Sequence, residues 1–506
     1  MSRCDLKEPG KYLFRQGVSD AELSSTNRSF SIGTCAIGTA PDEVLLDIFD
    51  FYRQDVMCSP YSWAGNWRWH TLVHVCRRWR HIVLTSSGRL DLRLLCTVGR
   101  PVTKYLDCWP PTLPIAILYN FPQFSSPHPE DERDVLTALE NPDRVCSIEL
   151  FASNELLAKV SRVMQVPFPA LKNLSLRPMN PFTPAPIVSE GFLGGSAPGL
   201  QKFSFSGEPP SVLPNFLLSC RGLVDLQLLC VPYPDQFLPE LIVTTLSNLS
   251  RLKILNIGLN GFLTFTPRRS HLPRLTFSAL SEFTFTGSGE YLEDLLARID
   301  TPFIQRIDIR FHRPLSDAPQ LCQFIFRTEG LRSQNQATIK RGRSINLMFR
   351  QAGRSTGSPM VRYPPITIKN CNISLLVEDW QASVIQFCLQ LTPLLSGVKW
   401  LTVESTAEQA LPQEVVGPAD WLDLFRPFSA VEELYVCRLL GSPVAFSLAG
   451  AAGQAEILPA LRSVFFEDAE EFALAEETIK SFSLWELSNV KKIFIVILYE
   501  RYPKKV

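Results

Sequence analysis

The sequence of 506 residues has no excess of either charge, because 50 Lys and Arg balance 50 Asp and Glu. It therefore lacks the long-range field that a dedicated nucleic-acid or membrane-surface binder uses. No uninterrupted apolar run approaches the ~20 residues that span a bilayer. The first residues, MSRCDLKEPGKYLF, also lack the apolar segment of a secretory signal. We therefore expect a soluble intracellular protein of the cytoplasm, the nucleus or both.

Signatures of catalysis and metal binding are also missing. No Gly-x-x-x-x-Gly-Lys-Ser/Thr, Gly-x-Gly-x-x-Gly or His-Glu-x-x-His motif occurs. The thirteen Cys include no Cys-x-x-Cys pair, so His70, His74 and Cys76 make a poor zinc site, and the cysteines are expected to be reduced, mostly buried thiols. Residues 353–357 fit Gly-x-Ser-x-Gly, but no His follows His312 to act as the base, which favours a loop. We expect no enzyme, no metal and no cofactor.

The N-terminal part of the chain changes character at Thr39. Residues 1–36 are rich in Ser, Gly, Thr and charge and predict a flexible tail. Residues 39–42 carry a helix start signal with Pro41 in the first turn. One apolar stripe of helical spacing follows, formed by Val44, Leu45, Ile48, Phe49 and Tyr52.

A second helix is predicted over roughly 69–84, after a loop at 53–68. Its apolar face is formed by Trp69, Leu72, Val75, Cys76, Trp79, Ile82 and Val83. Two helices this short cannot bury both stripes alone. We therefore expect the apolar surface that these helices leave uncovered to pack against another part of the chain or against a partner protein.

From about residue 145 an apolar residue recurs at positions n, n+3 and n+5 of successive segments. Position n is Val145, Leu171, Leu200, Leu223, Leu252, Leu280 and Ile304, and later Val398, Val431 and Leu461. The first spacings, 23 to 29 residues, lie in the range of leucine-rich repeats. Helix-like stretches lie between them, at 154–165, 239–250, 290–300, 380–395 and 419–427. Strand plus helix at this period predicts a curved parallel sheet with helices outside.

In each predicted strand, n+3 and n+5 face the core and n+2 and n+4 face outward. We expect the outward positions to recognise a target protein, with Asp225, Gln227, Arg306, Asp308, Trp400 and Tyr435 among them. Alternatively, any one of these side chains is simply exposed on the surface and contacts no target.

The repeat is irregular in its second half. The stretch from Ile304 to Val398 is expected to hold three or four irregular units, with strands at 343–349 and 373–379. Only residues 252–262 carry the complete repeat, which ends with Asn260 and Phe262. The apolar run at 493–499 predicts a terminal buried strand.

The segment 40–83 resembles the F-box, the helical module that docks substrate receptors onto SCF-type ubiquitin ligases. Matching residues are Pro41, Glu43, Leu45, Leu46, Ile48 and Phe49, and then Leu72, Val75, Cys76, Arg77, Trp79 and Ile82. The order helix, loop and Val-Cys-Arg-x-Trp is the specific part of the match, and Ala40 stands where the family usually has Leu. The layout is similar to the large F-box families of mushroom-forming fungi.

The resemblance implies a substrate-recognition subunit of an SCF-type E3 ubiquitin ligase, which performs no chemistry itself. A Skp-type adaptor, and through it a cullin, would bind Pro41, Leu45, Leu46, Ile48, Phe49, Leu72, Val75, Cys76, Trp79 and Ile82. An unknown target protein would bind the repeats. Two alternatives stay open: a leucine-rich-repeat interaction scaffold with no ligase role, and an enzyme without a sequence signature.

The predicted fold class is α/β, a small N-terminal helical F-box-like module followed by a curved leucine-rich-repeat-like solenoid. The predicted divisions are a tail at 1–36, the helical module at 37–90, a linker or capping segment at 91–139, the repeats at 140–475 and a C-terminal cap at 476–506.

Overall fold

The computed structural model divides the chain into two compact units, Met1–Asp91 and Leu92–Val506. The residues that it describes are 39–54, 68–97, 101–120, 129–180, 191–207, 213–231, 238–259, 274–312, 317–341, 344–351, 370–376, 380–405, 418–437, 440–450, 457–468 and 492–497. Five sequence predictions lie wholly or mostly outside them: the tail at 1–36, the loop at 53–68, the end of the complete repeat at Asn260 and Phe262, the loop at 353–357, and the C-terminal cap at 476–506.

The first unit contains α2 (Asp42–Gln54), α3 (Arg68–Leu72) and α4 (Arg77–Thr85). Helix α2 begins where the start signal predicts, with Asp42 and Glu43 in its first turn, where carboxylates suit the helix dipole. The single helix predicted over 69–84 is wrong, because the chain leaves the helical conformation between α3 and α4. The backbone of Cys76 is extended there, and its sulfur accepts a hydrogen bond from the amide of Trp79, which starts α4 as a separate helix.

In the described part of the second unit, sixteen strands form one sheet and two short strands form another. The strands are β1 (Leu94–Thr97), β2 (Ile115–Asn120), β3 (Val145–Ala152), β4 (Asn173–Pro178), β5 (Lys202–Ser206), β6 (Asp225–Val231), β7 (Ile254–Leu259), β8 (Leu275–Thr276), β9 (Glu282–Gly287), β10 (Ile299–Asp300), β11 (Arg306–Phe311), β12 (Gln336–Arg341), β13 (Ser344–Arg350), β14 (Asn370–Leu376), β15 (Trp400–Ser405), β16 (Glu433–Val436), β17 (Ser463–Asp468) and β18 (Lys492–Ile497).

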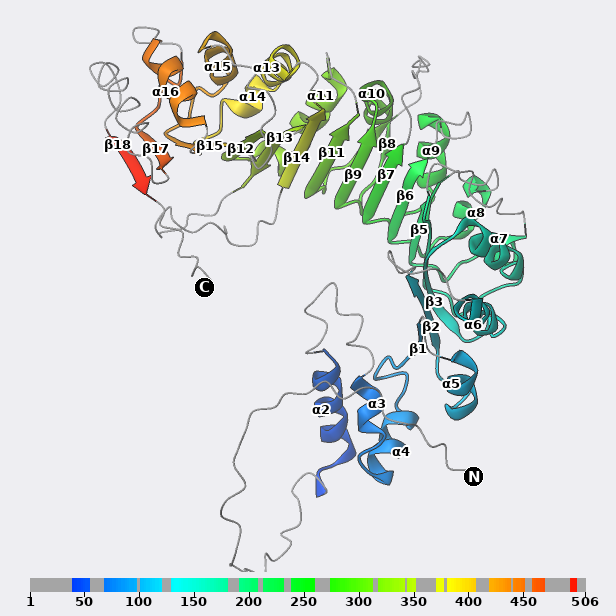
Figure 1. The fold of residues 1–506 in the computed structure, drawn as a ribbon. Helices are drawn as coiled ribbons and strands as arrows, with labels where there is room; N and C mark the ends of the chain where they lie inside the picture. Colours follow the sequence, from blue (N-terminus) through cyan, green and yellow to red (C-terminus); the bar gives the residue numbers. More distant parts are fainter. Residues whose placement is uncertain are drawn as a thin grey trace, which may run out of the picture. The chain divides into compact units, whose positions relative to one another are not determined.

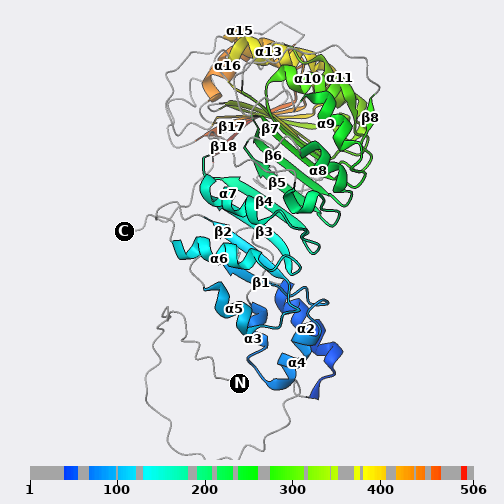
Figure 2. The same cartoon turned by 90° about the vertical axis from the view of Figure 1, so that its right-hand side faces the viewer.

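Helices connect these strands and lie along one face of the large sheet, on the outer side of the arc that its strands follow (Figure 1 and Figure 2). They are α5 (Val102–Cys108), α6 (Pro129–Leu139), α7 (Asn154–Val163), α8 (Leu213–Ser219), α9 (Pro239–Leu246), α10 (Gly289–Arg298), α11 (Pro319–Arg327), α12 (Glu329–Arg332), α13 (Trp380–Gln390), α14 (Thr392–Leu395), α15 (Pro418–Phe425) and α16 (Gly441–Gly450), with the 3-10 turn η2 (Phe192–Gly195). The prediction of a mixed α/β fold with a long, mostly parallel sheet is confirmed.

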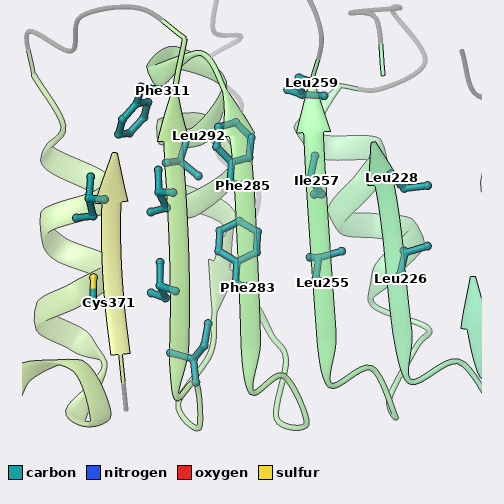
Figure 3. Packing of buried hydrophobic residues seen from close by; sticks show 14 of the residues in the cluster. Leu226, Leu228, Leu255, Ile257, Leu259, Phe283, Phe285, Leu292, Phe311 and Cys371 are labelled. Carbon is teal, nitrogen blue, oxygen red and sulfur yellow. The ribbon is translucent and has the colours of Figure 1, made fainter. Parts of the chain in front are cut away.

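Two rows of apolar side chains cross the sheet between the strands and the helices, and we call them the apolar ladder. One row places the n+3 residues Leu226, Leu255 and Phe283 next to one another on β6, β7 and β9 (Figure 3). The n+5 residues Leu228, Ile257 and Phe285 form the second row in the same register. All of these side chains are buried. Every strand predicted from the n, n+3, n+5 pattern is present.

The sheet extends beyond the predicted repeats at both ends. Strands β1 and β2 pair in parallel with each other, and β2 pairs with β3, so the predicted linker at 91–139 supplies two strands of the sheet. Ile115 and Ile117 are as deeply buried as the repeat residues, which explains why this segment joins the sheet. The terminal strand predicted at 493–499 is present as β18, which pairs in parallel with β17.

Between Ile304 and Val398, where three or four irregular units are expected, the sheet departs from the order of the repeats, although strands are present near both predicted stretches, as β13 and β14. The strand order there is β11-β14-β13-β12-β15, so the three inserted strands lie in reverse order. Strand β13 is antiparallel to both of its neighbours, whereas β14 pairs in parallel with β11 and β12 with β15. Only two residues, Gly342 and Arg343, separate β12 from β13, and so short a connection joins antiparallel strands.

The inserted strands keep the apolar ladder intact. Ile307 of β11 is followed across the sheet by Cys371, Phe349, Ala337 and Leu401, which share one row. All five are at most 1 % exposed. The insertion therefore changes the direction of one strand and the order of three without opening the core.

Neighbouring helices are also joined by polar contacts on the outer side. The carboxylate of Glu293 in α10 accepts hydrogen bonds from the amides of Gln320 and Leu321 in the first turn of α11, at 2.7 and 2.9 Å. These amides have no partner within their own helix, so Glu293 caps a helix of the next repeat. Burial nevertheless raises the pKa of Glu293 above its usual value, against the opposing effect of the two amides.

Within the described residues, none of the helices combines the length and apolarity that a bilayer crossing requires. Several cysteines lie in the core, as the sequence predicts. Burial raises the pKa of Cys96, Cys322 and Cys388 to about 12, which keeps these thiols protonated.

The raised pKa of Glu293 predicts how stability depends on pH. The folded protein binds this proton more tightly than the unfolded chain, whose reference value is 4.5. The protonated Glu293 therefore contributes its full stabilisation below pH 4.5, and this stabilisation is lost as the pH rises through the pKa of Glu293 in the folded protein. In Glu293→Gln this loss is absent, so the free energy of unfolding of the wild type should fall relative to the variant over that range.

Chemical denaturation at a series of pH values measures this difference. Glu290→Gln, which removes an exposed carboxylate from the first turn of the same helix, is the control for loss of one charge. The free energy of unfolding of the wild type and of Glu293→Gln could instead depend on pH in the same way. That result would show that the titration of Glu293 does not affect stability.

Candidate functional site

Helix α2 of the first unit has two apolar faces. Leu45 and Phe49 face inward and are 0 and 1 % exposed, and Leu46 is 9 % exposed. Val44, Ile48 and Phe51 are 46, 47 and 73 % exposed. The spacing of four and three residues places Val44, Ile48 and Phe51 on one side of the helix. We call these three residues the exposed stripe.

The inward face of α2 packs against the other two helices of the unit. The ring of Phe49 meets the ring of Trp79 in α4 edge to face, with centroids 4.8 Å apart. Trp69, Leu72 and Val73 of the α3 segment are buried as well. Three helices thus supply enough apolar surface to close a small core, which two helices would not.

Ion pairs at the surface join α2 to the α4 region. The Asp42 carboxylate accepts two hydrogen bonds from the Arg78 guanidinium, which also donates one to the carbonyl of Ala40. Asp47 forms a further ion pair with Arg89. Because these carboxylates are largely exposed, such pairs contribute little to stability and mainly fix the orientation of α4 against α2.

The segment between α3 and α4 presents further apolar surface. Val75 is 57 % exposed. Cys76 is exposed and serves as the N-cap of α4, and Trp79 is half-buried. His74 is exposed and His70 half-buried. The described residues contain no group of three or more His, Cys, Asp or Glu arranged to hold a metal ion.

The structure divides the predicted adaptor-binding residues into two sets. Leu45, Leu46, Phe49, Leu72 and Ile82 are buried, so the prediction that these side chains are left uncovered is wrong. Pro41, Ile48, Val75 and Cys76 are exposed, and Trp79 is partly exposed. The buried set holds the unit together, and only the second set can contact a partner.

Sequence reasoning missed Val44 and Phe51 as candidate contact residues. Val44 and Ile48 were predicted to share one stripe with Leu45 and Phe49. At 100° per residue the two sets lie on different sides of the helix. The sequence has no local signal that separates them, because neighbouring apolar residues at each turn are typical of one apolar stripe.

In the second unit, the predicted outward positions face away from the apolar ladder. Gln227, Asp308, Trp400 and Tyr435 are partly exposed and Arg306 is exposed. Asp225 is the exception, since it is only 8 % exposed and accepts a hydrogen bond from Gln227.

Several charges on this face neutralise one another. Arg306 pairs with Glu282 across the strands at 3.2 Å. Asp308 pairs with Arg310 and accepts a hydrogen bond from the amide of Asn372. The face is therefore polar with mostly compensated charge between β9 and β14.

Comparisons with known proteins add little to this geometry. No family model and no curated protein matches the sequence. Among solved structures, the leucine-rich repeat-containing protein LegL7 from Legionella pneumophila aligns with 79 % of this chain and 99 % of its own, at 11 % identity and a TM-score of 0.27. The fold is defined by the strand order and register of the sheet.

The two faces of α2 predict opposite responses to truncation. Phe49→Ala removes a buried ring and should destabilise the first unit by about 3–5 kcal/mol. Ile48→Ala removes a half-exposed side chain and should change stability by about 0.5 kcal/mol or less. Hydrogen exchange of peptides covering α2 in the full chain measures both effects. Equal acceleration of exchange in the two variants would contradict the assignment of the faces.

Proposed function

We propose that this protein is a substrate-recognition subunit of an SCF-type E3 ubiquitin ligase, acting in the cytoplasm or the nucleus. The first unit is the F-box and binds a Skp-type adaptor, which binds a cullin. The second unit is the leucine-rich-repeat-like region and binds a target protein. The observation that carries this proposal is the exposed stripe Val44, Ile48 and Phe51 on a helix of the F-box-like segment.

The exposed stripe supports a docking role because its burial by a partner is favourable. A fully buried Val, Ile or Phe side chain contributes ~1.5–3 kcal/mol, and these three side chains have about half or more of their surface still to lose. Aromatic residues are enriched at protein interfaces, which fits Phe51, the most exposed of the three. Pro41, Val75 and Trp79 add exposed surface on the same unit.

In this role the protein accelerates ubiquitin transfer by proximity. A chain that binds the adaptor through one unit and the target through the other makes their encounter intramolecular, which raises the effective concentration of the target. No side chain of this protein takes part in the transfer itself.

A leucine-rich-repeat scaffold without a ligase role is the second candidate. It is favoured by the long sheet with an outward polar face, which is suited to protein binding whatever the first unit does. The two candidates differ in whether the first unit binds a Skp-type adaptor.

A pull-down of the full chain with a purified Skp-type adaptor tests the proposal. The wild type should bind, and Ile48→Asp combined with Phe51→Asp should weaken binding by more than about 100-fold, because two apolar anchors become charged. Leu45→Asp is unsuitable as a test, since Leu45 is fully buried and a charge there would unfold the unit.

Phe446→Asp is the matched control, because Phe446 is an exposed phenylalanine of the second unit at 64 % exposure. It should bind the adaptor like the wild type. Hydrogen exchange confirms that α2 stays folded in the double variant. Failure of the wild type to bind, or full binding by the double variant, would favour the scaffold.

A further inference from the structure

Strands β15, β16 and β17 are neighbours near the C-terminal end of the sheet (Figure 1). Three aromatic side chains lie on their outward face. Tyr435 and Phe465 are cross-strand partners, and their rings stack with centroids 4.4 Å apart and planes 5° from parallel. Trp400 pairs with Glu433, two residues before Tyr435, so it is a diagonal neighbour of the tyrosine. We call Trp400, Tyr435 and Phe465 the aromatic platform.

All three side chains of the platform belong to the outward set. Their strand neighbours Leu401, Val403, Leu434 and Val464 are buried in the apolar ladder, and side chains alternate along a strand. Each ring of the platform is partly exposed. Together they form an amphipathic surface where the rest of this face is mainly polar.

The carboxylate of Glu433 lies within the platform. Glu433 accepts a hydrogen bond from the hydroxyl of Tyr435 at 2.9 Å, and no Lys, Arg or His of the described residues lies within ion-pair distance of it. Glu282, at the same position of an earlier repeat, is instead paired with Arg306. Glu404, on the same face of β15, is only loosely paired with Lys340 at 3.8 Å.

The hydroxyl of Tyr435 remains a donor to this carboxylate at neutral pH. Burial raises the pKa of Tyr435, and its hydrogen bond to Glu433 and the charge of Glu433 raise it further. This hydrogen bond occupies one oxygen of Glu433 and leaves the other available.

Tyr435 and Phe465 stack face to face, and Trp400, the cross-strand partner of Glu433, is partly exposed. A tryptophan ring beside a carboxylate that has no cation among the described residues is complementary to a guanidinium group. The guanidinium is planar, stacks on aromatic rings, is weakly hydrated and presents several donors to a carboxylate. An ammonium group matches the charge but not the planar stacking. We propose that the aromatic platform and Glu433 bind an arginine side chain in an exposed segment of a partner protein.

This site concerns only the second unit, so it stands whether or not the first unit docks on an adaptor. If the protein is a ligase subunit, the arginine belongs to the target. If it is a scaffold, the arginine belongs to the protein that the repeats hold.

Fluorescence anisotropy with the full chain and labelled Ser/Gly peptides tests the site. The peptides carry a pair of arginine, lysine or citrulline residues, and citrulline keeps the shape of arginine without its charge. The arginine peptide should bind at least about fivefold more tightly than the lysine peptide, from stacking on the rings. The citrulline peptide should show no measurable binding.

Glu433→Gln should weaken binding of the arginine peptide by about tenfold, because a charge-assisted hydrogen bond is lost. Trp400→Ala should weaken it by about fivefold. Glu282→Gln is the matched control, since this carboxylate already has a cation, and it should leave the affinity within about twofold. Thermal unfolding verifies that each variant is folded.

Equal binding of the lysine or citrulline peptide would overturn the proposal. So would an affinity for the arginine peptide that Glu433→Gln leaves unchanged, or the absence of arginine-dependent binding by the wild type. The adaptor pull-down is a separate measurement, so the two proposals can fail independently.

Discussion

Burial of apolar side chains between neighbouring strands is the interaction on which the second unit depends. Leu255 of β7 is covered by Leu226 on one side and by Phe283 on the other, and the same register continues across the sheet. A single repeat exposes apolar surface on both flanks and becomes stable only when its neighbours cover it. The inward positions are therefore fixed by packing. The outward positions are not constrained by this packing and carry charges and aromatic rings.

The same constraint explains what could be predicted from the sequence. The n, n+3, n+5 pattern located strands such as β6 and β16 because the apolar ladder requires those residues. It could not give the order of β12, β13 and β14, because every strand in the sheet has the same alternation whatever its neighbours and direction. The two-residue connection at Gly342 and Arg343 was the local signal for an antiparallel pair.

The first unit was predicted less completely, because its core is small and each local contact matters. The sequence located α2 through its start signal, but it gave no sign that the sulfur of Cys76 would cap α4 and divide the second helix. It also merged the two faces of α2, because a list of apolar residues does not distinguish Ile48, which is half-exposed, from Phe49, which is buried. Burial depends on α3 and α4, which lie well beyond α2 in the chain.

The reversed strands at the centre of the sheet have a consequence for synthesis on the ribosome. The repeats up to β11 can stack in the order in which they emerge, each on the one before it. β12 has no docking edge when it appears, because its two neighbours, β13 and β15, are both made later. The growing sheet cannot advance until β14 closes against β11. The nascent chain must therefore hold an undocked β12–β13 hairpin until β14 has been made.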